Sequence, residues 1–174
     1  RVLFKWVLES LQRDPHTWLK QGGVSLSERK QVAWNSTFCA VDDLSAIGKK
    51  HRATINDMML NIVAGAIDRY AKSIGQDFNK HFCIRIGIPV NVRTSIHQMK
   101  ILGNMFGFMI GKLPLGLANA KDRLKFITKD MAYNKAIPEA LLGNKMAFLG
   151  RFMPQALVKS GFAKLSEYLS LVMT

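Results

Sequence analysis

The chain has 174 residues, of which 48% are hydrophobic and 21% are charged, so it is long enough for one globular domain with a buried core. Its formal charge of +13 favours anionic partners, among them nucleic acid, acidic lipid headgroups and phosphorylated cofactors. The two cysteines lie far apart and without metal-ligand spacing, which argues against a disulfide framework and against a zinc site.

Residues 1–13 have the pattern of an amphipathic helix, with one apolar face and one mainly polar face. The apolar positions are Leu3, Phe4, Val7, Leu8 and Leu11. Asp14-Pro15 ends this helix, and the glycines and serines that follow predict a surface linker. Residues 1–30 are therefore expected to be a helix and linker in front of a domain that spans residues 31–174.

Both ends of the chain suggest a piece of a longer protein. The sequence does not begin with methionine, and the apolar run 168–174 stops without a turn or a polar tail. We therefore expect the chain to be cut at both ends, with the domain cut short at its C-terminal end.

Two helices are predicted next in chain order. A strand over residues 31–40 precedes Asp42 and Asp43, whose charges favour the start of a short helix that ends near Lys50. A longer helix is predicted over residues 55–73, because apolar residues recur there with a helical period, and this apolar face is expected to be buried. Its members are Ile55, Met58, Met59, Ile62, Val63, Ala66, Ile67 and Tyr70.

The second half of the chain alternates strands with helices. Apolar residues at every second position predict a strand over 83–90, and Pro89 places its end near a sheet edge or a bulge. A second strand is predicted over 104–112, followed by a helix over 121–135 that packs through Leu124, Ile127 and Met131. The alternation predicts the α/β class, a layered structure with helices packed on a mixed sheet.

Several short motifs occur in order along the chain. They are Ala53-Thr-Ile-Asn-Asp-Met-Met-Leu60 with Val63-Ala-Gly-Ala-Ile67, then Pro89-Val-Asn-Val-Arg93, Leu102-Gly-Asn104, Leu113-Pro114 and Asp122-Arg-Leu124. Their order and spacing resemble the C-terminal half of the wax ester synthase/diacylglycerol acyltransferase (WS/DGAT) family. The end of the chain, 170–174, resembles the strand that leads into the family's Asn-x-x-Gly-Pro segment, so the resemblance covers nearly the whole chain.

This resemblance implies one half of a chloramphenicol-acetyltransferase-like, or condensation-domain, fold, with a tunnel between two similar halves. It also implies transfer of a fatty acyl group from acyl-CoA, as co-substrate, to a long-chain alcohol or diacylglycerol, without another cofactor. The family's general base is the second histidine of an H-H-x-x-x-D-G motif in the first half. That motif is absent here and the four histidines are isolated, so we assign no catalytic residue and expect the chain alone to be inactive.

The segment Thr54 to Asp57 carries the most specific of these motifs and allows two compatible interpretations. Thr54 and Asp57 have the spacing of a capping box, in which each side chain binds the backbone N–H of the other residue at a helix start. The resemblance implies in addition that this helix start, with Asn56 and Asp57, borders the tunnel and supports the active site.

Polar residues at the strand ends are the other candidates for the site. Asn91 and Arg93 follow a strand that is predicted to be buried, where polar groups need partners. Arg93 is expected either to form a salt bridge at the strand end or, with Asn91, to line the interface with the missing half near the tunnel. Gly103 and Asn104 are expected to form a tight turn into the next strand.

Basic residues are frequent in the last third of the chain. Five lie on one predicted helix, which is either a solvated face or a surface for an anionic membrane or the phosphates of CoA: Lys121, Arg123, Lys125, Lys129 and Lys135. No nucleic-acid-binding motif accompanies them, and no apolar run reaches the roughly 18 residues of a membrane span. We expect peripheral association with a cytosol-facing surface of the endoplasmic reticulum, plasma membrane or a lipid droplet. The alternative is a non-catalytic basic module that binds a lipid surface or another protein.

Overall fold

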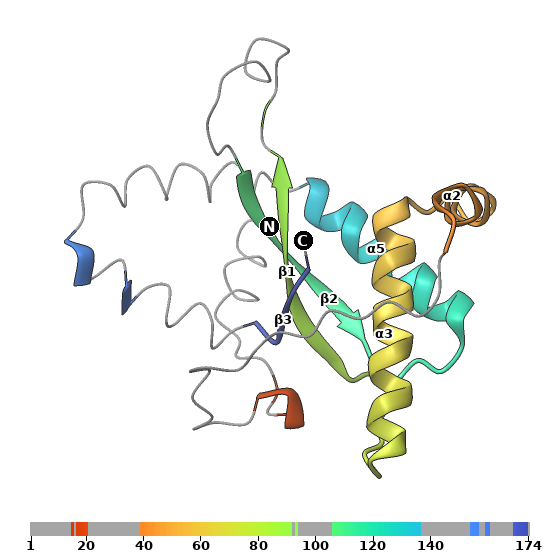
Figure 1. Ribbon diagram of the computed structural model, residues 1–174, viewed down its shortest axis with the longest axis horizontal. Coiled ribbons are helices and arrows are strands. Elements are labelled where there is room, and N and C mark those ends of the chain that lie inside the picture. Colours follow the sequence, from red (N-terminus) through yellow and green to blue (C-terminus); the bar gives the residue numbers. More distant parts are fainter. Residues whose placement is uncertain are drawn as a thin grey trace.

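The structure is a computed structural model, and it describes residues 15, 17–20, 39–91, 93, 106–136, 154–156, 159–160 and 169–173. The elements in chain order are η1 (Trp18–Lys20), α2 (Val41–Lys50), α3 (Ile55–Ser73), β1 (Cys83–Asn91), β2 (Phe106–Pro114), α5 (Ala120–Ala136) and β3 (Leu171–Val172), as drawn in Figure 1. The predicted helices over 42–50, 55–73 and 121–135 and the strand over 83–90 are confirmed to within about two residues, and the strand predicted over 104–112 runs to Pro114. The predicted helix over 1–13 and residues 31–38 of the strand predicted over 31–40 lie outside the described residues, and Cys39 and Ala40, which are described, are not in a strand.

The three described strands form one mixed sheet in the order β2-β1-β3. β1 and β2 pair antiparallel over their whole length, from Cys83 opposite Pro114 to Asn91 opposite Phe106. β3 pairs with β1 in parallel, with Leu171 opposite Ile86. Helices packed on a mixed sheet confirm the predicted α/β class.

Pro89 lies in the central strand, yet its missing N–H costs no hydrogen bond to β3. The N–H groups of Ser170 and Met173 donate to the carbonyls of Arg85 and Gly87, so alternate residues of β1 turn their backbone groups toward β3. Pro89 is the next residue in this series, and the pairing of β1 with β3 ends at Gly87. The prediction of a sheet edge is therefore wrong for the strand, which is central, although among the described residues Pro89 lies beyond the part of β1 that pairs with β3.

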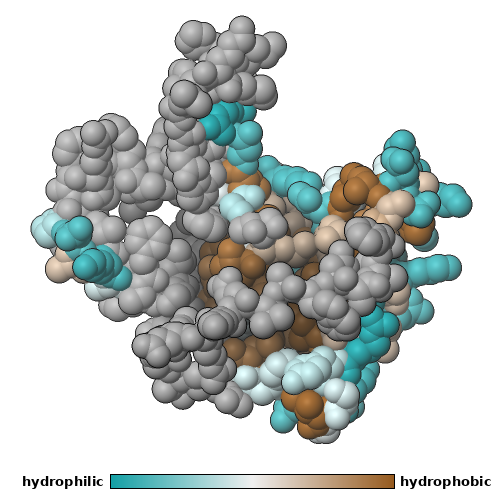
Figure 2. Space-filling model, in the orientation of Figure 1, coloured by the Kyte–Doolittle hydropathy of each residue, from teal (hydrophilic) through white to brown (hydrophobic). Residues whose placement is uncertain are grey.

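Helices α3 and α5 cover one face of the sheet and share its core. The core consists of buried residues from α3, both long strands, the turn after β2 and α5: Leu60, Ala64, Ile84, Ile86, Met109, Leu113, Leu115, Ile127 and Met131. In Figure 2 hydrophobic side chains gather at the centre of the molecule, where Figure 1 draws the strands. A smaller cluster of Leu44, Met58 and Leu124 joins α2 to the start of α3 and to α5.

The prediction for the buried face of α3 is correct for three residues, since Met58 is buried and Val63 and Ile67 pack against the core, and wrong for the other five, which are exposed. Four of the residues expected to be buried are exposed by 38% to 55% of their surface, namely Ile55, Met59, Ile62 and Tyr70. The buried face instead consists of Asp57, Met58, Leu60, Asn61, Ala64, Gly65, Asp68 and Ala71. Small residues on this face let α3 approach its neighbours closely, and its polar residues contact α5 as described below.

Among the described helices, none is both long enough and apolar enough to cross a lipid bilayer.

Candidate functional site

The start of α3 is closed by the capping box that the sequence predicts. The backbone N–H of Asp57 donates to Thr54 Oγ1 at 3.3 Å, and the N–H of Thr54 donates to Asp57 Oδ2 at 2.8 Å. These bonds satisfy two backbone donors that have no partner within the helix, and the carboxylate lies at the positive end of the helix dipole. The structural role predicted for Thr54 and Asp57 is confirmed.

Asp57 is also buried, with only 3% of the residue exposed. Its second oxygen, Oδ1, is buried and accepts no hydrogen bond from the residues that the structure describes. The neighbouring Asn56 is exposed to solvent. The role of this helix start as the border of a substrate tunnel stays a prediction.

Asn91 and Arg93 form one local unit at the end of β1. Asn91 Oδ1 accepts a hydrogen bond from the backbone N–H of Arg93 at 3.0 Å and lies 3.4 Å from Arg93 Nη1. Asn91 is the last residue of β1 rather than a residue beyond it. The carboxyl end of β1 and the amino end of α3 both lie toward the top of Figure 1, so the two predicted groups occur at the same end of the structure.

Arg123 is the buried charge that joins α3 to α5. Its Nε donates to the backbone oxygen and to the side-chain Oδ1 of Asn61, at 3.2 and 2.8 Å. Its Nη1 donates to the carbonyl of Leu117 at 2.8 Å and lies 3.4 Å from that of Ala118. One side chain, 8% exposed, therefore fixes the middle of α3 and the turn before α5.

The local sequence places Arg123 in this position. Asn119 caps α5, since its Oδ1 accepts the N–H of Lys121 at 2.8 Å, and Arg123 follows one turn later. On α3, a Cβ added to Gly65 would lie 2.6 Å from Arg123 Nη2, so any larger residue there would displace the guanidinium. Burial lowers the pKa of Arg123, and the nearby Asp68 carboxylate partly offsets this effect.

Sequence reasoning assigned Arg123 to an exposed basic face, and the structure corrects this. Lys121, Lys125, Lys129 and Lys135 are exposed as predicted, but Arg123 points to the opposite side of α5. The sequence of α3 did contain a pattern that indicates a polar contact with another element. Asn61, Gly65 and Asp68 recur at helical spacing on α3, and a glycine inside a helix, which costs about 1 kcal/mol, usually has a packing reason.

The remaining predicted residues give no catalytic centre. Gly103 and Asn104 lie outside the described residues. Of the histidines, the structure describes His51 and His81, and both are exposed. Within the described ranges no three His, Cys, Asp or Glu side chains are placed to bind a metal ion.

This α/β unit, with two helices on one face of a mixed sheet and a buried arginine between them, can be compared with known proteins. Residues 102–174, which contain β2, α5 and β3, match the sequence model of the WS/DGAT C-terminal domain. Over this segment the chain is therefore similar to the C-terminal domain of the WS/DGAT family. The match agrees with the predicted family over these residues, a shorter stretch than the resemblance suggested.

Two relatives come from Mycobacterium tuberculosis. The chain is 32% identical over 96 residues to "Putative diacyglycerol O-acyltransferase Rv3480c" of strain H37Rv and, equally, to "Putative diacyglycerol O-acyltransferase MT3584" of strain CDC 1551. Each match covers 55% of this chain and 18% of the relative. The chain thus corresponds to a small part of these proteins.

Proposed function

We propose that this chain is part of an O-acyltransferase that transfers a fatty acyl group from acyl-CoA to diacylglycerol or a long-chain alcohol. The observation that carries the proposal is the match of residues 102–174 to the WS/DGAT C-terminal domain. The names of the two mycobacterial relatives support an acyltransferase and, of the two acceptors, favour diacylglycerol.

In the proposed reaction the acceptor hydroxyl attacks the thioester carbonyl of acyl-CoA. A base takes the hydroxyl proton, the new ester bond forms, and CoA leaves as its thiol. The reaction needs neither a metal nor a covalent cofactor. We assign the base to an H-H-x-x-x-D-G segment of a longer protein, since this chain has no such segment.

The role of this chain in that reaction is structural support. We infer that it forms one half of a chloramphenicol-acetyltransferase-like fold and that the missing N-terminal half closes a tunnel against it. The capping box fixes the start of α3, and the Asn91–Arg93 unit fixes the end of β1, at the same end of the sheet. These two groups are the best candidates for contact with the tunnel, together with Gly103 and Asn104.

An assay with labelled palmitoyl-CoA tests the proposal. A longer protein that contains this chain is incubated with dioleoylglycerol, with hexadecanol or without acceptor. The products are then separated by lipid class. We expect an acceptor-dependent ester, which disappears when the second histidine of the H-H-x-x-x-D-G segment is replaced by alanine. The chain by itself, assayed in parallel, should form none.

Two outcomes would contradict the proposal. If the longer protein forms no ester with either acceptor, the alternative of a non-catalytic basic module gains support. If ester formation survives the histidine substitution, the assignment of the base to the other half is wrong.

A further inference from the structure

A small apolar hollow with a basic rim lies where β1 begins and β2 ends. Its volume is about 280 Å³, and it is lined by Lys80, His81, Cys83, Pro114, Leu117 and Phe126. Lys80 and His81 are exposed, whereas none of the described residues that line the hollow carries a carboxylate. Phe126, on α5, remains 36% exposed although it borders this apolar lining.

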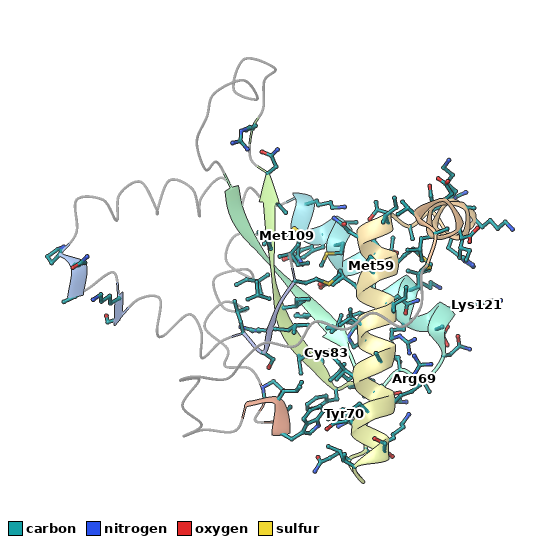
Figure 3. All side chains as sticks on the ribbon, viewed as in Figure 1. Met59, Arg69, Tyr70, Cys83, Met109 and Lys121 are labelled. Atoms are coloured by element: carbon teal, nitrogen blue, oxygen red, sulfur yellow. The ribbon has the colours of Figure 1, made fainter. Side chains whose placement is uncertain are left out.

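A row of lysines on α5 continues the basic rim. Lys121, Lys125 and Lys129 are all exposed and follow one another at intervals of four residues, so they lie along one side of the helix. Phe126 is adjacent to Lys125 in sequence and three residues from Lys129, and this places it beside the row. In Figure 3, Lys121 lies at the right-hand edge, away from the sheet. The same edge is lined by hydrophilic side chains in Figure 2.

We propose that this surface, formed by the hollow and the lysine row and called the Phe126 surface, docks against an anionic lipid bilayer. The lysines and Lys80 contact headgroup phosphates, while Phe126 enters the boundary between headgroups and acyl chains. The proposal rests on the proposed function, because an enzyme that acylates a lipid acceptor would meet that acceptor at a bilayer. It goes further by naming the residues that make the contact.

The combination of charge and apolar exposure favours lipid over nucleic acid. A groove for single-stranded nucleic acid uses several aromatic platforms along a basic track, whereas Phe126 is the one exposed aromatic side chain described on this surface. Two acids, Asp77 and Asp122, are exposed on the same elements, but they are outnumbered by the cations around them. The net charge of +13 adds long-range attraction to an anionic bilayer.

Vesicle sedimentation with the full 174-residue chain tests the proposal. Vesicles of phosphatidylcholine alone are compared with vesicles of equal parts phosphatidylcholine and phosphatidylglycerol. The triple variant Lys121→Gln, Lys125→Gln, Lys129→Gln should bind anionic vesicles on the order of 100-fold more weakly, at about fivefold for each lysine. Phe126→Ala should weaken binding by about threefold.

A matched control removes the same charge elsewhere. The variant Lys49→Gln, Lys50→Gln, Arg52→Gln loses three exposed cations at the end of α2 and should bind nearly as well as the original chain. Far-UV circular dichroism confirms that all variants are folded. Equal losses in the two triple variants would overturn the assignment of this surface, because only net charge would then matter.

Other occupants are separate outcomes of the same experiment. Duplex or single-stranded DNA that binds more tightly than anionic vesicles would overturn the proposal in favour of nucleic acid. Displacement from the vesicles by millimolar inorganic pyrophosphate would indicate a site for a free phosphorylated ligand. Since the assay contains neither acyl-CoA nor acceptor, its failure leaves the test of acyl transfer unaffected.

Discussion

The two faces of α3 have roles opposite to those that their composition predicts. The outer face carries Ile55, Met59 and Ile62 and is partly open to solvent, whereas the buried face carries Asp57, Asn61 and Asp68 among small residues. The apolar period correctly identified the helix and its bounds. It failed to identify the inner side, because the requirement there is space and hydrogen bonding for an arginine of another helix.

The contrast shows which contacts fix the position of α3 in this unit. Apolar burial is supplied mainly by β1, β2 and α5, and α3 contributes Leu60 and Ala64 to the same core. Besides the apolar contacts, a set of directional bonds from Arg123 fixes α3 against α5. Such bonds contribute little when both partners can reach water, but losing one partner leaves the others buried and unsatisfied. The inner face should therefore be sensitive to single substitutions, and the outer face tolerant.

The largest effect is expected for Arg123→Met. The substitution leaves the acceptors of Asn61 and Leu117 without their donor, and it removes the cation near Asp68, so the free energy of unfolding should fall by about 3 kcal/mol. Urea unfolding followed by circular dichroism measures this change. Lys125→Met, on the exposed side of the same helix, should change stability by no more than about 0.5 kcal/mol. Similar values for the two variants would contradict the assigned role of Arg123.

A double-mutant cycle sharpens the comparison. Gly65→Ala should lower the free energy of unfolding by about 1 to 2 kcal/mol, because its methyl group collides with Arg123 Nη2 and displaces the bonded guanidinium. In an Arg123→Ala background the same change should raise stability by up to about 1 kcal/mol, through helix propensity alone. The sign reversal is read from urea unfolding of the four chains. Equal effects in both backgrounds would show that the two residues are not coupled.

A smaller effect is expected at the capping box. Thr54→Ala removes the acceptor of the Asp57 N–H, so the free energy of unfolding should fall by about 1 kcal/mol. Thr54→Ser keeps the hydroxyl and should restore most of the stability. If serine and alanine behave alike, the hydroxyl is not what stabilises this helix start.

Much of the fold was predictable because it depends on local periodicity. The bounds of α3 follow from a helical repeat of apolar residues and from Thr54-x-x-Asp57, and β1 follows from alternation over Ile84 to Val90. Strand order was not predictable, since the parallel pairing of β3 with β1 joins residues more than 80 positions apart through two registered pairs. Such pairing leaves no local pattern in the sequence.

The candidate site was predicted only in part. The capping role of Thr54 and Asp57 is encoded within four residues and was therefore accessible. The contact of Arg123 with Asn61 joins residues 62 positions apart, and an arginine among lysines has the composition of a solvated face. Only the coincidence of a mid-helix glycine with polar residues on one side of α3 pointed to a buried charge.

The claim that α3 packs through its inner face, and not through its apolar outer face, is tested most directly by a pair of matched truncations. Leu60→Ala and Ile62→Ala each remove branched apolar side chains two residues apart on the same helix, which are 2% and 44% exposed. Urea unfolding should show a loss of about 2 to 4 kcal/mol for Leu60→Ala and less than about 1 kcal/mol for Ile62→Ala. An equal or larger loss for Ile62→Ala would show that the outer apolar face is the buried one, and would contradict the account.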